Sequence, residues 1–261
     1  MRRRLPEAVL IDIDGVLHVD GTLVPGAPPA LERVRSLGVT IRLVTNTTRR
    51  ARADVVRALL DLGFRVEPDE IMTAVRATGA LLRSWGSPRC KVYSPRDLSD
   101  DLPGISIVET DPEVVVLGDL GHGFDYSSLN AIFREVLGGA RLVAFQANRY
   151  WRSSEGLVLD AGPFVRAIEY AAGVEATVVG KPSRDFFLAA VRDAGADPGR
   201  SVMVGDDLES DVGGARAAGL VGVLVRTGKF SERALETTAA PPDRVLDSIA
   251  DLPGVLDDLL P

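Results

Sequence analysis

Two carboxylates near the start of the chain have the spacing and the setting to bind a cation. Asp12 and Asp14 follow the apolar residues 8–11, a run typical of a buried parallel strand. Positions i and i+2 of a strand project to the same side, so both carboxylates can face one crevice at its carboxyl end. Gly15 then allows a sharp turn in which backbone N–H groups approach a ligand. A pair of acids there attracts a hard cation, and that cation can hold a phosphate.

Three later apolar runs also end in polar side chains. These side chains are Thr45 and Asn46 after residues 39–44, Lys181 after residues 176–179, and Asp206, Asp207 and Asp211 after residues 201–204. All strands of a parallel sheet point one way, so we expect the four strand ends to share one edge of a single sheet. Each motif alone is a weak signal, and their convergence is what predicts a site.

The acids in this set suit phosphoryl transfer. A carboxylate such as Asp12 can accept a phosphoryl group as an acyl phosphate, which water then hydrolyses. Asp14 could protonate the leaving oxygen and later deprotonate the water. Asp206 would complete the oxygen shell of a cation, and Mg²⁺ is favoured because it accepts few protein ligands together with water and phosphate.

The remaining polar groups could hold the phosphate. Thr45 and Asn46 offer O–H and N–H donors to its oxygens, and Lys181 supplies a positive charge to Asp12 and the phosphate together. Each also has an ordinary structural interpretation: Thr45 and Asn46 as a helix N-cap, and Lys181 as a surface lysine at a helix start. Asp207 and Asp211 lie at a predicted helix start, where acids suit the helix dipole.

Strand and helix patterns alternate along both ends of the chain. This predicts an α/β fold with a doubly wound, Rossmann-like parallel sheet. We divide the chain into a first core segment (1–76), an inserted α/β cap domain (77–176) and a second core segment (177–261). Further predicted helices cover residues 49–62, 126–137, 163–172, 183–194 and 210–218, with a last one after residues 241–242; further strands cover residues 90–93, 105–108, 114–117, 142–145 and 221–225.

Composition excludes several classes of protein. The net charge of −7 argues against a nucleic-acid partner. No apolar stretch is long enough for a membrane span and no leader pattern is complete, so we expect a cytoplasmic protein. The single cysteine, Cys90, is expected to be an ordinary buried thiol. His18 and His122 do not suggest a zinc site. Tyr150 and Trp151 are expected in the core of the inserted domain, and the alternative is that they line a substrate entrance.

In their order, the four motifs resemble those of the haloacid dehalogenase superfamily of phosphohydrolases. The motifs are Asp12–Val16, Thr45–Asn46, Gly180–Pro182 and Gly205–Asp211. Residues 43–48, 155–162 and 226–230 further resemble the subfamily with a large α/β cap (type IIA), and most of all its phospholysine phosphohistidine inorganic pyrophosphate phosphatase group.

The resemblance implies roles for the matching residues. Asp12 would be the nucleophile and a metal ligand, Asp14 the acid/base with its backbone carbonyl on the metal, and Asp206 the third protein ligand. Thr45, Asn46 and Lys181 would hold the phosphate. The expected function is Mg²⁺-dependent hydrolysis of a small phosphorylated compound, and a homodimer is compatible with this subfamily. Two alternatives stay open: a phosphomutase using the same intermediate, and a non-catalytic phospho-aspartate signalling module.

Overall fold

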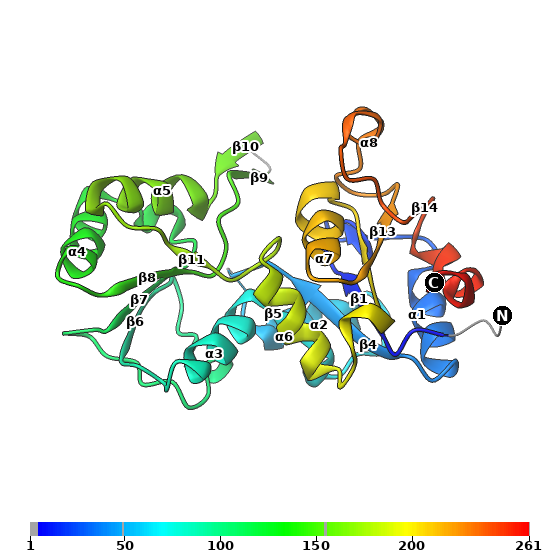
Figure 1. Ribbon diagram of the computed structural model, residues 1–261, viewed down its shortest axis with the longest axis horizontal. Helices are drawn as coiled ribbons and strands as arrows, with labels where there is room; N and C mark the ends of the chain where they lie inside the picture. Colours follow the sequence, from blue (N-terminus) through cyan, green and yellow to red (C-terminus); the bar gives the residue numbers. More distant parts are fainter. Residues whose placement is uncertain (1–4, 49, 154–155, 261) are drawn as a thin grey trace. The chain divides into compact units, whose positions relative to one another are not determined.

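The chain folds into two compact units, one inserted into the other (Figure 1). The structure, a computed structural model, describes residues 5–48, 50–153 and 156–260. The first unit comprises Met1–Thr45, Arg52–Met72 and Lys181–Pro261, and the second comprises Asn46–Ala51 and Thr73–Gly180. The chain therefore passes between the units four times, and two of these crossings, Thr45–Asn46 and Gly180–Lys181, lie at residues predicted to form the site.

The first unit is built on a six-stranded sheet with the order β14-β13-β12-β1-β4-β5. The strands are β1 (Ala8–Asp12), β4 (Thr40–Thr45), β5 (Ile71–Thr73), β12 (Ser201–Gly205), β13 (Val221–Val225) and β14 (Arg244–Leu246). The neighbours from β14 to β4 pair in parallel. Every residue of β1 and β12 is buried, as expected for apolar strands covered on both faces.

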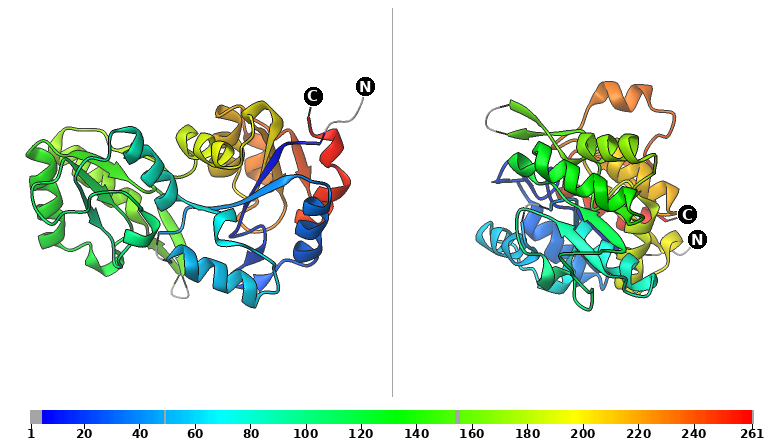
Figure 2. Two further views of the ribbon diagram at one scale, coloured as in Figure 1. Left: turned by 90° about the horizontal axis from the view of Figure 1, so that it is seen from below. Right: turned by 90° about the vertical axis from the view of Figure 1, so that its left-hand side faces the viewer.

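Helices cover both faces of this sheet. They are α1 (Ala27–Ser36), α2 (Arg52–Asp61), α6 (Arg184–Asp193) and α7 (Gly214–Ala217), whereas α8 (Glu232–Thr237) has no buried residue and is not part of these layers. Apolar residues of α1 and α2 pack with alternate residues of the central strands in one core, while α6 contacts α7 and β1 (Figure 2). Strands β2 (His18–Val19) and β3 (Thr22–Leu23) form a small hairpin after β1. Short 3₁₀ helices occupy Pro68–Glu70, Pro198–Arg200, Ile249–Gly254 and Leu256–Asp258.

The second unit has its own parallel sheet, with the order β11-β8-β7-β6. Its strands are β6 (Cys90–Tyr93), β7 (Val114–Leu117), β8 (Arg141–Ala144) and β11 (Thr177–Val178). Its helices are α3 (Ala74–Ser84), α4 (Tyr126–Leu137) and α5 (Ala161–Ala172), with 3₁₀ turns at Ser99–Asp101 and Gly121–Gly123. Apolar residues of α4 and α5 pack together with β7 and β8 (Figure 1).

Several predicted elements differ from the structure. The predicted strand at residues 105–108 is wrong, because only an isolated bridge joins Ile107 to Cys90. Beyond residues 241–242 a strand, β14, precedes two 3₁₀ helices in place of the expected helix. The antiparallel hairpin of β9 (Tyr150–Ser153) and β10 (Gly156–Leu159) was not predicted. Its Tyr150 is 54% exposed, so the core placement predicted for this ring is wrong, while the side chain of Trp151 lies outside what the structure describes.

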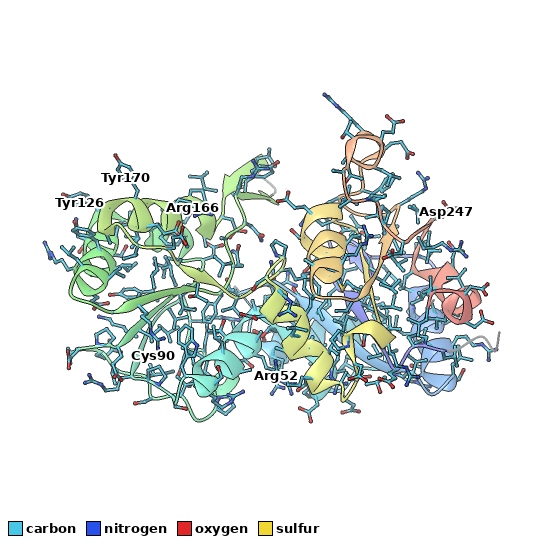
Figure 3. The ribbon with its side chains drawn as sticks, viewed as in Figure 1. Arg52, Cys90, Tyr126, Arg166, Tyr170 and Asp247 are labelled. Atoms are coloured by element: carbon cyan, nitrogen blue, oxygen red, sulfur yellow. The ribbon has the colours of Figure 1, made fainter. Side chains whose placement is uncertain are left out.

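Two further expectations concern isolated features. Cys90, labelled in Figure 3, is buried on β6 as expected, and desolvation raises the pKa of its thiol to about 11. A thiol with that pKa is a poor nucleophile at neutral pH. Among the described residues, none of the helices combines the length and the apolar character that a bilayer crossing requires.

Candidate active site

Three aspartates from neighbouring segments of the first unit lie together at the carboxyl end of its sheet. Asp12 is the last residue of β1, and Asp206 follows β12, which pairs with β1 in parallel. Asp211 lies in the segment that follows. Carboxylate oxygens of the three residues lie within 4.8 Å of one another, and all three residues are buried. Two acids 194 positions apart in the chain thus meet because the strands that carry them are adjacent.

Lys181 joins two of these carboxylates. Its Nζ lies 2.6 Å from Asp12 Oδ1 and 2.7 Å from Asp211 Oδ1, and its side chain is 4% exposed. A buried ammonium between two carboxylates forms charge-assisted hydrogen bonds that fix the rotation of both acids. Lys181 therefore orients Asp12 and neutralises part of the charge at this site.

The segment that presents Asp211 differs from the predicted helix at residues 210–218. A π-helical turn (Leu208–Gly213) precedes the short α7. Asp207 begins this turn, its Oδ1 accepting hydrogen bonds from the backbone of Glu209 and Ser210. A Cβ at position 205 would lie 2.2 Å from the Cβ of Asp211, so Gly205 is what allows the turn to approach the end of β12. Turns of this kind occur frequently at functional sites.

The expectation that all four strand ends belong to one sheet is wrong for Lys181. The strand before it, β11, pairs with β8 in the sheet of the second unit. Lys181 itself belongs to the first unit and immediately precedes α6 there. An alternating sequence pattern does not distinguish two parallel sheets in one chain, which is why the pattern assigned β11 to the core.

The charges at the site do not balance without a cation. Three carboxylates face the buried ammonium of Lys181, and the ammonium of Lys229, whose side chain is 71% exposed, also attracts them. Burial and repulsion by Asp211 raise the pKa of Asp12 well above its ordinary value, against the attraction of Lys181. Burial and repulsion by Asp211 also raise the pKa of Asp206 to about 7. Burial opposes the charged form of Lys181, but attraction to Asp12 and Asp211 outweighs it and raises the pKa of this lysine.

The donor set fits a hard divalent cation. Asp206 Oδ1 is buried and has no hydrogen-bond partner within the described part of the chain. An orphaned buried carboxylate oxygen costs free energy unless a ligand contacts it. Clustered carboxylate oxygens are the ligands that Mg²⁺, Mn²⁺ and Ca²⁺ prefer. Asp12 and Asp206, with Asp211 beside them, would therefore hold such a cation.

The raised pKa of Asp206 predicts how stability depends on pH in the absence of a divalent cation. A carboxyl group whose pKa is higher in the folded than in the unfolded state stabilises the fold most at low pH, and this contribution disappears as pH rises through the folded-state value. In EDTA, the wild type should therefore lose stability relative to Asp206→Asn between about pH 4 and 7, by at most about 4 kcal/mol. Urea unfolding followed by circular dichroism measures this difference. The prediction would be contradicted if the free energy of unfolding of the wild type, relative to that of Asp206→Asn, stayed constant or increased as pH rises.

Asp14 lies apart from the buried cluster, towards solvent. Its side chain is 63% exposed, its Oδ2 accepts a 3.4 Å hydrogen bond from Thr45 Oγ1, and its Oδ1 lies 3.7 Å from His18 Nε2. Thr45 is buried at the end of β4. An exposed carboxyl group beside the buried Asp12 can exchange protons with a substrate or water, as the predicted acid/base role requires.

The structure assigns Gly15 a contact that the sequence did not predict. Its N–H donates to the His18 carbonyl at 2.7 Å, and its Cα face lies against the carboxylate of Asp206. The predicted contact of Gly15 with substrate stays a prediction.

Asn46 is half-buried and belongs to the second unit, where its Oδ1 would lie 2.7 Å from a Cβ at Gly180. Its predicted contact with phosphate also stays a prediction.

One group beside the predicted metal ligand Asp206 was missed. The backbone N–H of Lys229, in the loop after β13, donates to Asp206 Oδ2 at 2.7 Å. Residues 226–230 resemble the subfamily, but the sequence predicted no role for them in the site. The available signal was a Thr-Gly pair directly after a buried apolar strand, a place where backbone groups commonly approach a ligand.

Comparisons with known sequences agree with this geometry. The haloacid dehalogenase-like hydrolase family model matches residues 9–102, and a HAD-hydrolase-like model matches residues 178–252. The chain is 42% identical over 260 residues to the human haloacid dehalogenase-like hydrolase domain-containing protein 2, covering 98% of this chain and 97% of that protein. It is 36% identical over 244 residues to the phospholysine phosphohistidine inorganic pyrophosphate phosphatase of Xenopus laevis, covering 89% and 88%.

Solved structures with the same fold include phosphatases. The p-nitrophenyl phosphatase from Archaeoglobus fulgidus is 28% identical, with a TM-score of 0.89 over 97% of this chain and 100% of that one. A glycerol phosphate phosphatase from Mycobacterium tuberculosis in complex with magnesium is 27% identical, with a TM-score of 0.86 over 96% and 78%. Sequence identity along nearly the whole chain and a shared fold lead to one conclusion: this protein belongs to the haloacid dehalogenase-like hydrolases and is a phosphohydrolase.

Proposed function

We propose that the protein is a Mg²⁺-dependent phosphatase that hydrolyses a small phosphorylated compound through an aspartyl-phosphate on Asp12. The observation that carries the proposal is the buried Asp12–Lys181–Asp211 network beside Asp206, whose Oδ1 has no hydrogen-bond partner in the described residues. The substrate would be a phosphomonoester, a phosphoamide or a pyrophosphate, the chemistry that the names of the relatives print.

Asp12 would act as the nucleophile. A carboxylate oxygen of Asp12 attacks phosphorus, and the bond from phosphorus to the leaving group breaks. Lys181, held 2.6 Å from Asp12 Oδ1, keeps the carboxylate oriented and offsets negative charge on the phosphoryl oxygens. A bound Mg²⁺ neutralises charge on the phosphoryl group and orients it.

Asp14 would move the protons. In the first half-reaction its carboxyl group donates a proton to the leaving oxygen or nitrogen. In the second half-reaction its carboxylate accepts a proton from the water that attacks the acyl phosphate, which releases inorganic phosphate and restores Asp12. The 63% exposure of its side chain allows both transfers, and the hydroxyl of Thr45 restrains its orientation.

Removal of divalent cations tests the proposal directly. We expect the protein to release inorganic phosphate from p-nitrophenyl phosphate, imidodiphosphate or pyrophosphate with Mg²⁺, to lose at least about 100-fold of this activity in EDTA, and to regain it when Mg²⁺ is restored. Phosphate release should be followed with a colorimetric assay over several phosphorylated metabolites. Full activity in EDTA would contradict the role of Mg²⁺.

The same assay separates the two alternatives. A phosphomutase would return the phosphoryl group to its substrate and release little free phosphate from any compound. A signalling module would release none catalytically and would keep a phospho-aspartate for minutes, detectable as an acid-stable mass increase of the intact chain. Multiple turnovers with free phosphate as product would exclude both.

A further inference from the structure

Two glycines, from the loops after β1 and β13, lie against one oxygen of the Asp206 carboxylate. A Cβ built at Gly15, after β1, would lie 1.9 Å from Asp206 Oδ2, and so would a Cβ built at Gly228, after β13. Both glycines have positive φ, +95° and +62°, which side chains disfavour. We call Gly15 and Gly228 around this carboxylate the glycine slot. It leaves no room for a side chain at either position beside Asp206 Oδ2.

The two oxygens of this carboxylate have different surroundings. Oδ2 accepts the Lys229 backbone N–H at 2.7 Å, whereas Oδ1 is buried without a partner among the described residues. The slot and this hydrogen bond together restrict rotation of the carboxylate, which leaves Oδ1 as the oxygen available to a cation. A carboxylate whose other oxygen accepts a hydrogen bond is better oriented for metal binding than a carboxylate without one.

One side chain joins the two loops of the slot. Thr227 Oγ1 donates a 2.5 Å hydrogen bond to the Gly15 carbonyl oxygen, across 212 positions of sequence. The partners belong to loops after β13 and β1, the strands on either side of β12. The Gly15 carbonyl is also one peptide away from that of Asp14, which the family resemblance makes a metal ligand. This contact therefore fixes both loops relative to Asp206.

We propose that Thr227 is a positioning residue for the divalent cation, its hydroxyl closing the glycine slot so that Asp206 presents Oδ1 to the metal. This inference rests on the proposed Mg²⁺ dependence and adds a residue to it. Loss of the hydroxyl frees the loop that carries Gly228 and Lys229, and the carboxylate gains rotational freedom that metal binding must remove. The affinity for the cation then falls, whereas turnover at saturating cation changes little.

Thr227→Val tests this inference because valine keeps the shape of threonine and removes only the hydroxyl. Thr227→Ser keeps the hydroxyl, and Thr237→Val is the matched control, since Thr237 is exposed on α8 and also donates to a backbone carbonyl, at 2.8 Å. Binding of Mg²⁺ alone is measured by calorimetry after removal of metals with EDTA, and of Mn²⁺ alone by electron paramagnetic resonance. Circular dichroism verifies that each variant is folded.

We expect Thr227→Val to bind both ions about 10-fold more weakly than the wild type, and Thr227→Ser and Thr237→Val to bind within about 2-fold of it. The Mg²⁺ concentration for half-maximal phosphate release should increase by the same factor. Equal affinity of wild type and Thr227→Val would overturn the inference, as would a Thr227→Ser loss equal to that of Thr227→Val. If the wild type binds neither ion, the proposed Mg²⁺ dependence itself fails, an outcome distinct from both. Should valine prevent folding, Thr227→Ala, which also lacks the hydroxyl, takes its place with the same expected loss of affinity.

Discussion

Asp12→Asn should abolish phosphate release, by on the order of 10⁴-fold or more. An amide is a poor nucleophile towards phosphorus, so the acyl phosphate cannot form. The substitution keeps the size of the side chain. It also removes one of the negative charges whose burial and mutual repulsion raise the pKa of Asp12, so the protein in EDTA should melt at a temperature no lower than the wild type. Activity and stability are thus expected to change independently.

Asp185→Asn is the matched control for this experiment. Asp185 lies in the first turn of α6 and is exposed, so the same substitution there leaves the site untouched. Its rate of phosphate release should equal that of the wild type. Intact-protein mass spectrometry after rapid acid quenching adds an independent measurement, since a phosphate adduct should form on the wild type and not on Asp12→Asn. Full turnover by Asp12→Asn would contradict the proposed mechanism.

Lys181→Met should affect both activity and stability. Removal of one partner from a buried ion pair leaves uncompensated charge, here on Asp12 and Asp211, at a cost of about 3–5 kcal/mol in the free energy of unfolding near neutral pH. The loss should become smaller as pH falls and Asp12 takes up a proton. Turnover should fall by about 10²–10³-fold, because a fixed positive charge near the phosphoryl group is lost.

Lys91→Met shows what the loss of a more exposed lysine–carboxylate pair costs, for comparison with the buried Lys181 network. Lys91 pairs with Glu135 at 2.7 Å, the distance of the Lys181–Asp211 pair, but about a fifth of each side chain is exposed. Solvent reduces the cost of losing that pair to about 1 kcal/mol or less. Urea unfolding of both variants with excess Mg²⁺ and with EDTA measures the difference. Equal destabilisation by the two substitutions would mean that burial of the Lys181 network contributes nothing.

The parts of the fold that could be predicted are those with one dominant signal. Strands β6, β7 and β13 and helix α4 were predicted with their observed bounds, because apolar runs and a helical repeat mark them clearly. The hairpin of β9 and β10 lacks such a signal, since Leu157 and Leu159 on β10 are more than half exposed. Strand β14 has only three residues, too few for a periodicity.

The candidate site was predictable where sequence position and sheet geometry are directly linked. Asp12 and Asp206 end adjacent parallel strands, and this rule required no further knowledge. Asp211 and Lys229 approach the site through a π-helical turn and a loop, and loop geometry depends on contacts that no periodicity encodes. Lys181 was singled out from the sequence, but the strand before it was assigned to the wrong sheet. A homodimer, the absence of a nucleic-acid partner and a cytoplasmic location stay predictions.

The glycine slot limits which acidic side chain position 206 can carry, and with it the size of the cation that the predicted site can hold. The backbone of the two glycines at Oδ2 limits how far an acid at position 206 can extend, so a longer glutamate would have to fold back or displace a loop. Position 206 therefore accommodates aspartate and not glutamate, although both side chains carry a carboxylate. The residues that define the reach of the ligand bear no side chain at all, and redesign for a larger ion would have to begin with the loops that carry them.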